Sequence, residues 1–97
     1  MENDILNIVQ KAFSLSPNDV IPDSKDSRRI LIRILSTIPG EELIALLLRN
    51  ACGMTLKQAG MNMGFTGERV RQIEAIGYRM LRRPFRSEKL KHLLPHT

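Results

Sequence analysis

The segment from Phe65 to Glu74 constrains the fold more than any other part of the chain. Thr66 is a good helix N-cap, because its hydroxyl accepts a hydrogen bond from a backbone N–H group that otherwise has no partner. Apolar or small residues then recur at helical spacing on one side, at Val70, Ile73, Gly77 and Leu81. Polar side chains fall on the opposite side, at Glu68, Gln72, Arg79 and Arg83. The segment therefore predicts an amphipathic helix with one packed face and one free face.

The free face carries the side-chain types that recognise base edges in DNA. Gln pairs with adenine, Glu accepts from cytosine, and Arg pairs with guanine or holds a phosphate group. The pattern therefore predicts a helix that enters the major groove.

Helical patterns account for the rest of the chain. They predict helices over about 3–14, 24–36, 39–52, 55–62 and 66–82, and a last short helix from Ser87 that carries Leu90, Leu93 and Leu94. A turn is expected at Ser16–Asp19, and no segment shows a convincing strand pattern. The sequence thus predicts an all-α fold, a small domain of five to six helices with a C-terminal helix-turn-helix. We divide the chain into an N-terminal helix and linker (1–26) and a DNA-binding domain (27–97). The first segment is expected to serve dimerisation or to brace the core.

Residues 56–73 fit the helix-turn-helix pattern at each position where packing or backbone geometry restricts the choice of residue. Gly60 is small where two helices cross closely, and Gly64 occupies the turn, where a positive φ favours glycine. Phe65 is expected to plug the core beside the turn, while Val70 and Ile73 anchor the second helix. In this arrangement the second helix enters the major groove and the first crosses the backbone.

Charge is unevenly distributed along the 97 residues, whose net charge is +5. Residues 1–53 hold six Lys/Arg and seven Asp/Glu, a net charge of −1, whereas residues 54–97 hold nine and three, a net charge of +6. A basic C-terminal half favours a polyanionic partner on one side of the molecule.

Other function classes find little support. The single Cys52 is expected to be a small, partly buried residue near a helix end, in a reducing cytoplasm. His92 and His96 have no further ligands at metal-binding spacing, so neither a metal nor a cofactor is expected. No Ser/His/Asp group, carboxylate pair or phosphate-binding glycine loop indicates an enzyme. The acidic start and the lack of a long apolar run predict neither a signal peptide nor a membrane span.

Several motifs together resemble region 4 of the sigma-70 type sigma factors of bacterial RNA polymerase. The similarity to region 4.2 is carried by Thr55-Leu56, Gly60, Gly64 to Thr66, Glu68 to Ala75, Leu81-Arg82, Pro84 and Arg86 to Leu90. Leu35 to Glu42 and the Leu-rich stretch to Arg49 resemble region 4.1. The resemblance covers about residues 30–94.

The resemblance implies a partner and a set of site residues. That family reads the −35 promoter element and docks on the flap of the polymerase β subunit. By resemblance, Glu68 and Gln72 face bases, and Arg71 and Thr55 serve phosphates or the adjoining surface. Arg79 and Arg82 lie where upstream-bound activators contact the family's domain. The full DNA-binding set predicted from pattern and resemblance is Thr55, Lys57, Thr66, Gly67, Glu68, Arg69, Arg71, Gln72, Arg79, Arg82, Arg83, Arg86 and Lys89. The basic tail, with Lys91, would follow the DNA backbone or meet a protein partner.

Gly67 departs from the family pattern, which has Arg at this position to read a guanine. Loss of a bidentate Arg–guanine contact removes roughly 1–3 kcal/mol of discrimination. The sequence read by this chain is therefore expected to differ from the consensus element. The chain also has no counterpart of the sigma regions that bind the clamp and melt the −10 element.

Two functions stay open at this stage. The first is a sequence-specific transcription regulator that binds double-stranded DNA in the bacterial or phage-infected cytoplasm, with or without contact to RNA polymerase. The size and the family favour a free-standing regulator of a phage or other mobile element. The second is a protein-interaction module that binds the β-flap or a sigma or anti-sigma partner, with DNA binding incidental. A homodimer also stays open, since one helix-turn-helix reads few base pairs.

Overall fold

The computed structural model describes residues 3–16, 18–19 and 21–94. Over these residues it contains six α-helices and no strand, which confirms the all-α prediction. The helices are α1 (Leu6–Ala12), α2 (Lys25–Leu35), α3 (Gly40–Asn50), α4 (Leu56–Met63), α5 (Gly67–Leu81) and α6 (Pro84–Leu90), and a 3₁₀ turn follows at Lys91–Leu93. Pro17, Val20 and His96 lie outside the described residues.

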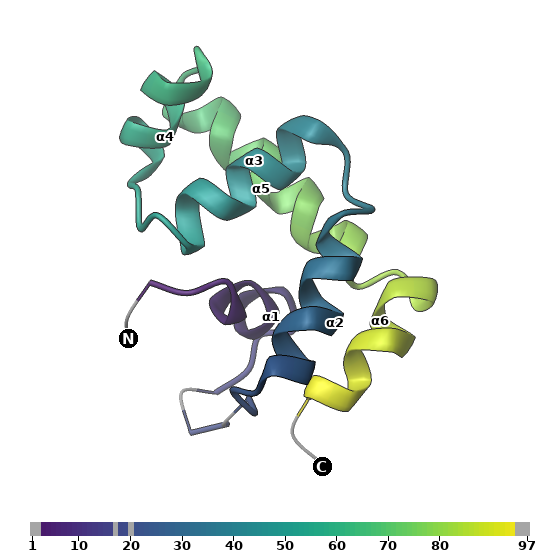
Figure 1. Ribbon diagram of the computed structural model, residues 1–97. Helices are drawn as coiled ribbons and strands as arrows, with labels where there is room; N and C mark the ends of the chain where they lie inside the picture. Colours follow the sequence, from purple (N-terminus) through teal and green to yellow (C-terminus); the bar gives the residue numbers. More distant parts are fainter. Residues whose placement is uncertain (1–2, 17, 20, 95–97) are drawn as a thin grey trace.

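Two hydrophobic clusters hold the helices together. The first joins α1, α2 and α6 to α3 and the second half of α5, with Leu31, Leu46, Leu81 and Leu90 fully buried. The second lies between α3, α4 and the first half of α5, around Ala45, Ala59, Val70 and Ile73. Because α3 and α5 each contribute to both clusters, they form the frame that connects the two ends of the molecule (Figure 1).

The N-terminal helix α1 packs into the first cluster. Ile8 and Val9 have no exposed surface, and α1 contacts both α3 and α5. The Arg28 guanidinium ties the entry of α1 to α2, because it donates to both carboxylate oxygens of Asp4 at 2.9 and 2.7 Å. These contacts brace the core, while a role of this segment in dimerisation stays a prediction.

Caps and turns mostly occur where the sequence predicts them. The Ser24 hydroxyl accepts from the N–H of Ser27 at the start of α2. In the predicted first turn, Ser16 N donates to Asp19 Oδ2 at 2.9 Å. α5 begins after its Thr66 cap and ends at Leu81, within one residue of the predicted end.

Three local predictions were wrong. α1 is shorter than predicted and ends at Ala12, and Ser14 adopts a positive φ of 51°. α6 begins at Pro84 and not at Ser87, because proline fits the first helical position, where no N–H bond is lost. Cys52 is exposed and not partly buried.

Candidate DNA-binding surface

The corner between α4 and α5 is built by side-chain caps and close backbone packing. Thr55 and Gln58 form a capping box at the start of α4: the Thr55 hydroxyl accepts from Gln58 N at 3.1 Å, and Thr55 N donates to Gln58 Oε1 at 2.9 Å. At its other end, Gly64 has a φ of +76°, which confirms the predicted glycine turn. The N–H of Phe65 donates to the carbonyl of Gly60 at 2.8 Å.

Gly60 sets how closely the two helices approach. A Cβ atom on Gly60 would lie 2.5 Å from the carbonyl oxygen of Phe65, which is too close for any side chain. The α4–α5 corner therefore requires glycine at position 60, as the sequence predicted.

The first turn of α5 is fixed by Thr66, whose hydroxyl accepts from Arg69 N at 3.1 Å. Gly67 follows as the first helical residue. A Cβ atom on Gly67 would meet Leu56 at 3.5 Å, an ordinary van der Waals distance. A side chain would therefore fit at Gly67, and steric exclusion does not explain the glycine.

The exposed face of the first two turns of α5 is polar. Glu68, Arg69, Arg71 and Gln72 are all exposed, while Val70 and Ile73 are buried against α3 and α4. Glu68 and Arg71 form an ion pair with a nearest distance of 2.6 Å. The hydrogen bonds from Arg71 hold the pKa of the Glu68 carboxyl below its ordinary value. This face therefore presents a carboxylate, two guanidinium groups and an amide to solvent.

A buried polar cluster joins α5 to α3 behind the exposed face. Glu74 is only 7% exposed; it accepts from Arg49 Nε at 3.3 Å and from the Tyr78 hydroxyl at 2.9 Å. Asn50 donates to the same hydroxyl at 3.1 Å, and burial raises the pKa of Tyr78 above its ordinary value. The predicted internal ion pair of Glu74 is thus present. Its partner Arg49 was missed, because the two residues are 25 positions apart and share no local pattern.

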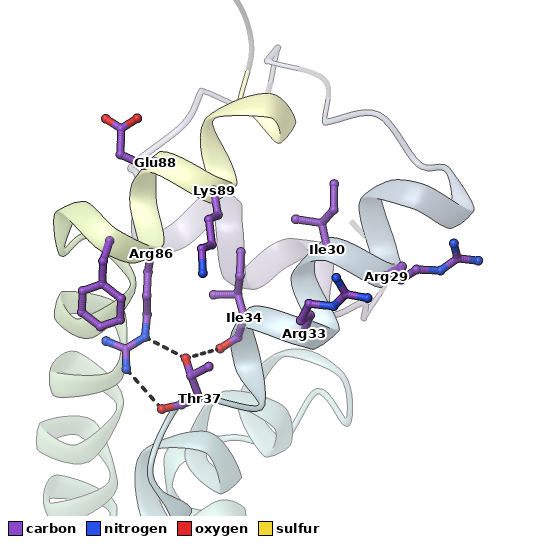
Figure 2. Close-up of a pocket in the computed structure, with 9 residues that line it drawn as sticks. Arg29, Ile30, Arg33, Ile34, Thr37, Arg86, Glu88 and Lys89 are labelled. Atoms are coloured by element: carbon purple, nitrogen blue, oxygen red, sulfur yellow. Dashed lines mark hydrogen bonds between the residues drawn. The ribbon is translucent and has the colours of Figure 1, made fainter.

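The predicted DNA-binding residues fall into two groups in space. Thr55, Lys57, Thr66, Gly67, Glu68, Arg69, Arg71 and Gln72 lie on α4, on the first two turns of α5, or at the N-caps of these helices. Arg79 is exposed on the same helix, seven residues beyond Gln72 and about 10 Å farther along the helix axis. Beyond it, Arg82 is the C-cap of α5, Arg83 is the N-cap of α6, and Arg86 and Lys89 lie in α6 (Figure 2).

Two cations of the second group have internal partners. Arg82 donates to the carbonyl oxygen of Ala12 at 2.9 Å, and so ties the end of α5 to α1. Arg86 donates to Thr37 Oγ1 at 2.9 Å, to the Thr37 carbonyl at 3.1 Å and to the Met80 carbonyl at 3.3 Å. Arg83 and Lys89 are exposed. DNA contact by these four residues stays a prediction.

In the described part of the chain, no helix is long and apolar enough to cross a membrane. The same residues contain no group of three or more His, Cys, Asp or Glu side chains placed to hold a metal ion.

The corner between α4 and α5, with its glycine turn and exposed second helix, defines a helix-turn-helix domain. A family model described as "Sigma-70, region 4" matches residues 34–83, and the chain belongs to this family. The matched residues include all of α3, α4 and α5. Membership of this family supports a DNA-binding role in transcription.

A curated relative supports the same assignment. The protein named RNA polymerase sigma factor SigA from Clostridium acetobutylicum is 39% identical to this chain over 88 residues. The match covers 80% of this chain and 23% of the relative, so the chain spans about a quarter of the length of that protein.

Proposed function

We propose that this protein is a sequence-specific transcription regulator that places the first two turns of α5 in the major groove of DNA. The observation that carries the proposal is the exposed polar face of α5. The opposite face of the helix packs against α3 and α4 through buried side chains. In helix-turn-helix proteins the N-terminal residues of the second helix contact base edges. In this chain those residues are Glu68, Arg71 and Gln72.

Base and backbone contacts divide among the exposed residues by their chemistry. Glu68 and Gln72 have the directional acceptors and donors that distinguish bases. Lys57 on α4 and Arg69 on α5 are exposed cations beside them, and they are suited to phosphate contacts that fix position without reading sequence. Thr55 and Thr66 have their hydroxyls occupied as caps, so their proposed role is to orient the helices.

Contact with RNA polymerase is the second part of the proposal. It is supported by family membership and by the similarity to a protein named as an RNA polymerase sigma factor. The exposed Arg79 and Arg83 lie beyond the first two turns of α5, where a polymerase or activator could reach them while these turns lie in the major groove.

Selection from a pool of random double-stranded DNA tests the proposal. We expect an enriched motif, and a steep fall of affinity with salt because phosphate contacts release counterions. Pull-down of RNA polymerase is the parallel measurement. Failure to enrich any sequence, together with successful polymerase capture, would contradict the DNA-reading proposal and favour the protein-interaction alternative.

A further inference from the structure

A polar pocket with a volume of about 430 Å³ lies between α1 and the C-terminal end of α3. It contains no residue of α4 or α5, and its α1 wall lies outside residues 34–83, which the family model matches. The side chains around the pocket are polar or charged, with the exception of Leu15. Its chemistry is therefore that of a site for a small polar molecule, separate from the proposed DNA-binding face.

Asn50 gives the pocket a buried hydrogen-bond acceptor without a partner. Its side chain is 1% exposed, and its amide nitrogen donates to the Leu46 carbonyl at 2.8 Å and to the Tyr78 hydroxyl at 3.1 Å. Because a carbonyl oxygen can only accept, this contact fixes which way the amide points. Within the described residues, Asn50 Oδ1 then accepts no hydrogen bond, which is rare for a buried oxygen. A donor that enters the pocket can satisfy this atom.

The charges around the pocket favour an anion. Lys11 and Arg49 both line it, and no carboxylate does. Arg49 shares its charge with Glu74 at 3.3 Å, whereas Lys11 has no carboxylate at ion-pair distance among the residues that the structure describes. The pocket therefore suits one anionic group next to a group that donates a hydrogen bond.

The turn after α1 places one more hydroxyl at the pocket. Ser14 lines it with a φ of 51°, and the N–H of Leu15 donates to the carbonyl of Gln10 at 2.9 Å, which closes the end of the helix. Glycine is the usual residue at such a left-handed position, because it adopts this backbone at no cost. Serine instead adds a donor and an acceptor to the wall of the pocket.

From these features we infer that the α1–α3 pocket binds a small hydroxylated anion, of the sugar-phosphate or sugar-acid type. The anionic group would lie between Lys11 and Arg49, and a hydroxyl would donate to Asn50 Oδ1. The volume falls within the range of about 300–1,000 Å³ that is usual for small-molecule pockets. The inference does not depend on sequence reading by α5.

Tyr78 supplies an internal reporter for the site. It is the single tyrosine of a chain that has no tryptophan. Its hydroxyl accepts from Asn50 and donates to Glu74 at 2.9 Å, so it is one hydrogen bond away from the pocket. A ligand that bonds to Asn50 should therefore change the intrinsic fluorescence of the protein.

Calorimetric titration of the full-length chain, followed in parallel by tyrosine emission, tests the inference. The two probes are ribose 5-phosphate and gluconate, which share the proposed chemistry and differ in the anionic group. Inorganic phosphate and hexanoate are matched anions without hydroxyl groups, and ribose and glucose are matched neutral compounds. Lys11→Gln removes the unpaired cation, and Lys25→Gln is the control, an equal charge change at an exposed lysine outside the pocket.

We expect saturable binding of at least one probe, with a change in tyrosine emission that follows the same curve. Binding of ribose 5-phosphate alone would assign a phosphate ligand, and binding of gluconate alone would assign a carboxylate. Lys11→Gln should weaken binding by about fivefold or more, because it removes a hydrogen bond to a charged group. Lys25→Gln should leave the affinity within about twofold, because it changes only the general field.

Three results would overturn the inference. One is the absence of saturable binding for both probes. The second is equal affinity for the matched compounds that lack either the hydroxyls or the charge. The third is an equal effect of Lys11→Gln and Lys25→Gln, or unchanged tyrosine emission at saturation, either of which would place the ligand elsewhere on the protein.

Discussion

The guanidinium of Arg71 donates two hydrogen bonds to the carboxylate of Glu68, at 2.6 and 2.9 Å, across one turn of the exposed face of α5. The pair joins two of the proposed DNA contacts to each other in the absence of DNA. It is solvent-exposed and therefore weak, so base edges and phosphates can compete for both side chains. Gln72 directly follows Arg71 and lies one turn beyond Glu68, and its replacement by Ala changes no charge.

We predict that Gln72→Ala changes the selected DNA motif, because the amide is proposed to contact a base edge. Lys57→Ala should instead weaken binding to all sequences about equally and lower the salt slope by about one. Parallel site selections and salt titrations measure both effects. An unchanged motif for Gln72→Ala would remove that residue from base reading.

Gly67→Arg should add a base contact. The position is helical and has room for a Cβ atom 3.5 Å from Leu56, so an arginine side chain can extend toward DNA. We expect a new preference for guanine of roughly 1–3 kcal/mol at one position of the site.

Gly67→Ala is the matched control, and it should fold at least as stably as the parent chain while leaving the motif unchanged. If Gly67→Arg and Gly67→Ala select the same motif, then position 67 does not face a base in this protein.

Gly60→Ala should destabilise the domain through a direct clash, since its Cβ atom would lie 2.5 Å from the Phe65 carbonyl oxygen. We expect a loss of about 1–3 kcal/mol in the free energy of unfolding, measured by urea titration. DNA binding should fall as well, because the angle between α4 and α5 must change.

Gly64→Ala separates steric crowding from backbone conformation. Nothing lies within 4 Å of a Cβ atom on Gly64, but its φ is +76°. The expected loss is about 1–2 kcal/mol, from the left-handed backbone alone. Equal stability of Gly60→Ala and the parent chain would contradict the close crossing of the helices.

Arg49→Met should be among the most damaging single substitutions outside the apolar core. It leaves the Glu74 carboxylate, 7% exposed, without its cation, and removes a 2.7 Å hydrogen bond to the Met54 carbonyl. Removal of one partner of a buried pair typically costs about 3–5 kcal/mol, and the partial exposure of Arg49 points to the lower part of that range.

The double variant Arg49→Met, Glu74→Gln should recover part of the loss, because no unpaired charge remains. Urea titrations of the parent, of Arg49→Met, of Glu74→Gln and of the double variant measure the coupling. Full additivity of the two substitutions would show that the pair contributes no interaction energy.

The Asp4–Arg28 ion pair should make stability depend on acid pH. Hydrogen bonds from Arg28 lower the pKa of Asp4 from its ordinary value of 3.8. A lowered folded-state pKa means that the stabilisation is complete above about pH 3.8 and is lost as the pH falls through the folded value.

Asp4→Asn should therefore lower Tm by a few degrees at neutral pH and should match the parent chain at strongly acid pH. Thermal unfolding across this range checks the sign. A Tm difference that stays constant into acid would show that Asp4 acts through packing and not through its charge.

Local sequence signals were sufficient to predict most of the helix-turn-helix formed by α4 and α5. Thr55, Thr66 and Gly64 act within one helical turn, so their hydroxyls and backbone freedom specify the ends of α4 and α5 wherever the helices lie. The periodicity of Val70, Ile73 and Leu81 likewise identified the buried face. The start of α6 was misplaced because Pro84 both ends one helix and begins the next.

Contacts between distant segments were not predictable in the same way. The hydrogen bond from Arg82 to the carbonyl of Ala12, 70 positions earlier, was not predicted, and contact of Arg82 with DNA or an activator stays a prediction. Arg86 was expected in a basic tail, yet it joins α6 to Thr37, 49 positions away. Hydrogen bonds at such separations depend on how the helices pack, and nothing in the local sequence encodes that packing.

The sequence by itself determined the helix caps, the glycine turn and the polar face of α5, because each depends on neighbours within a few residues. Only the tertiary structure decided which cations stay free. The same Arg and Lys residues look equivalent along the chain, but packing ties Arg49, Arg82 and Arg86 to internal oxygens. The packing of α6 against α2 also gathers Arg33, Lys89 and Phe85 into one groove, at the end of the molecule away from α4.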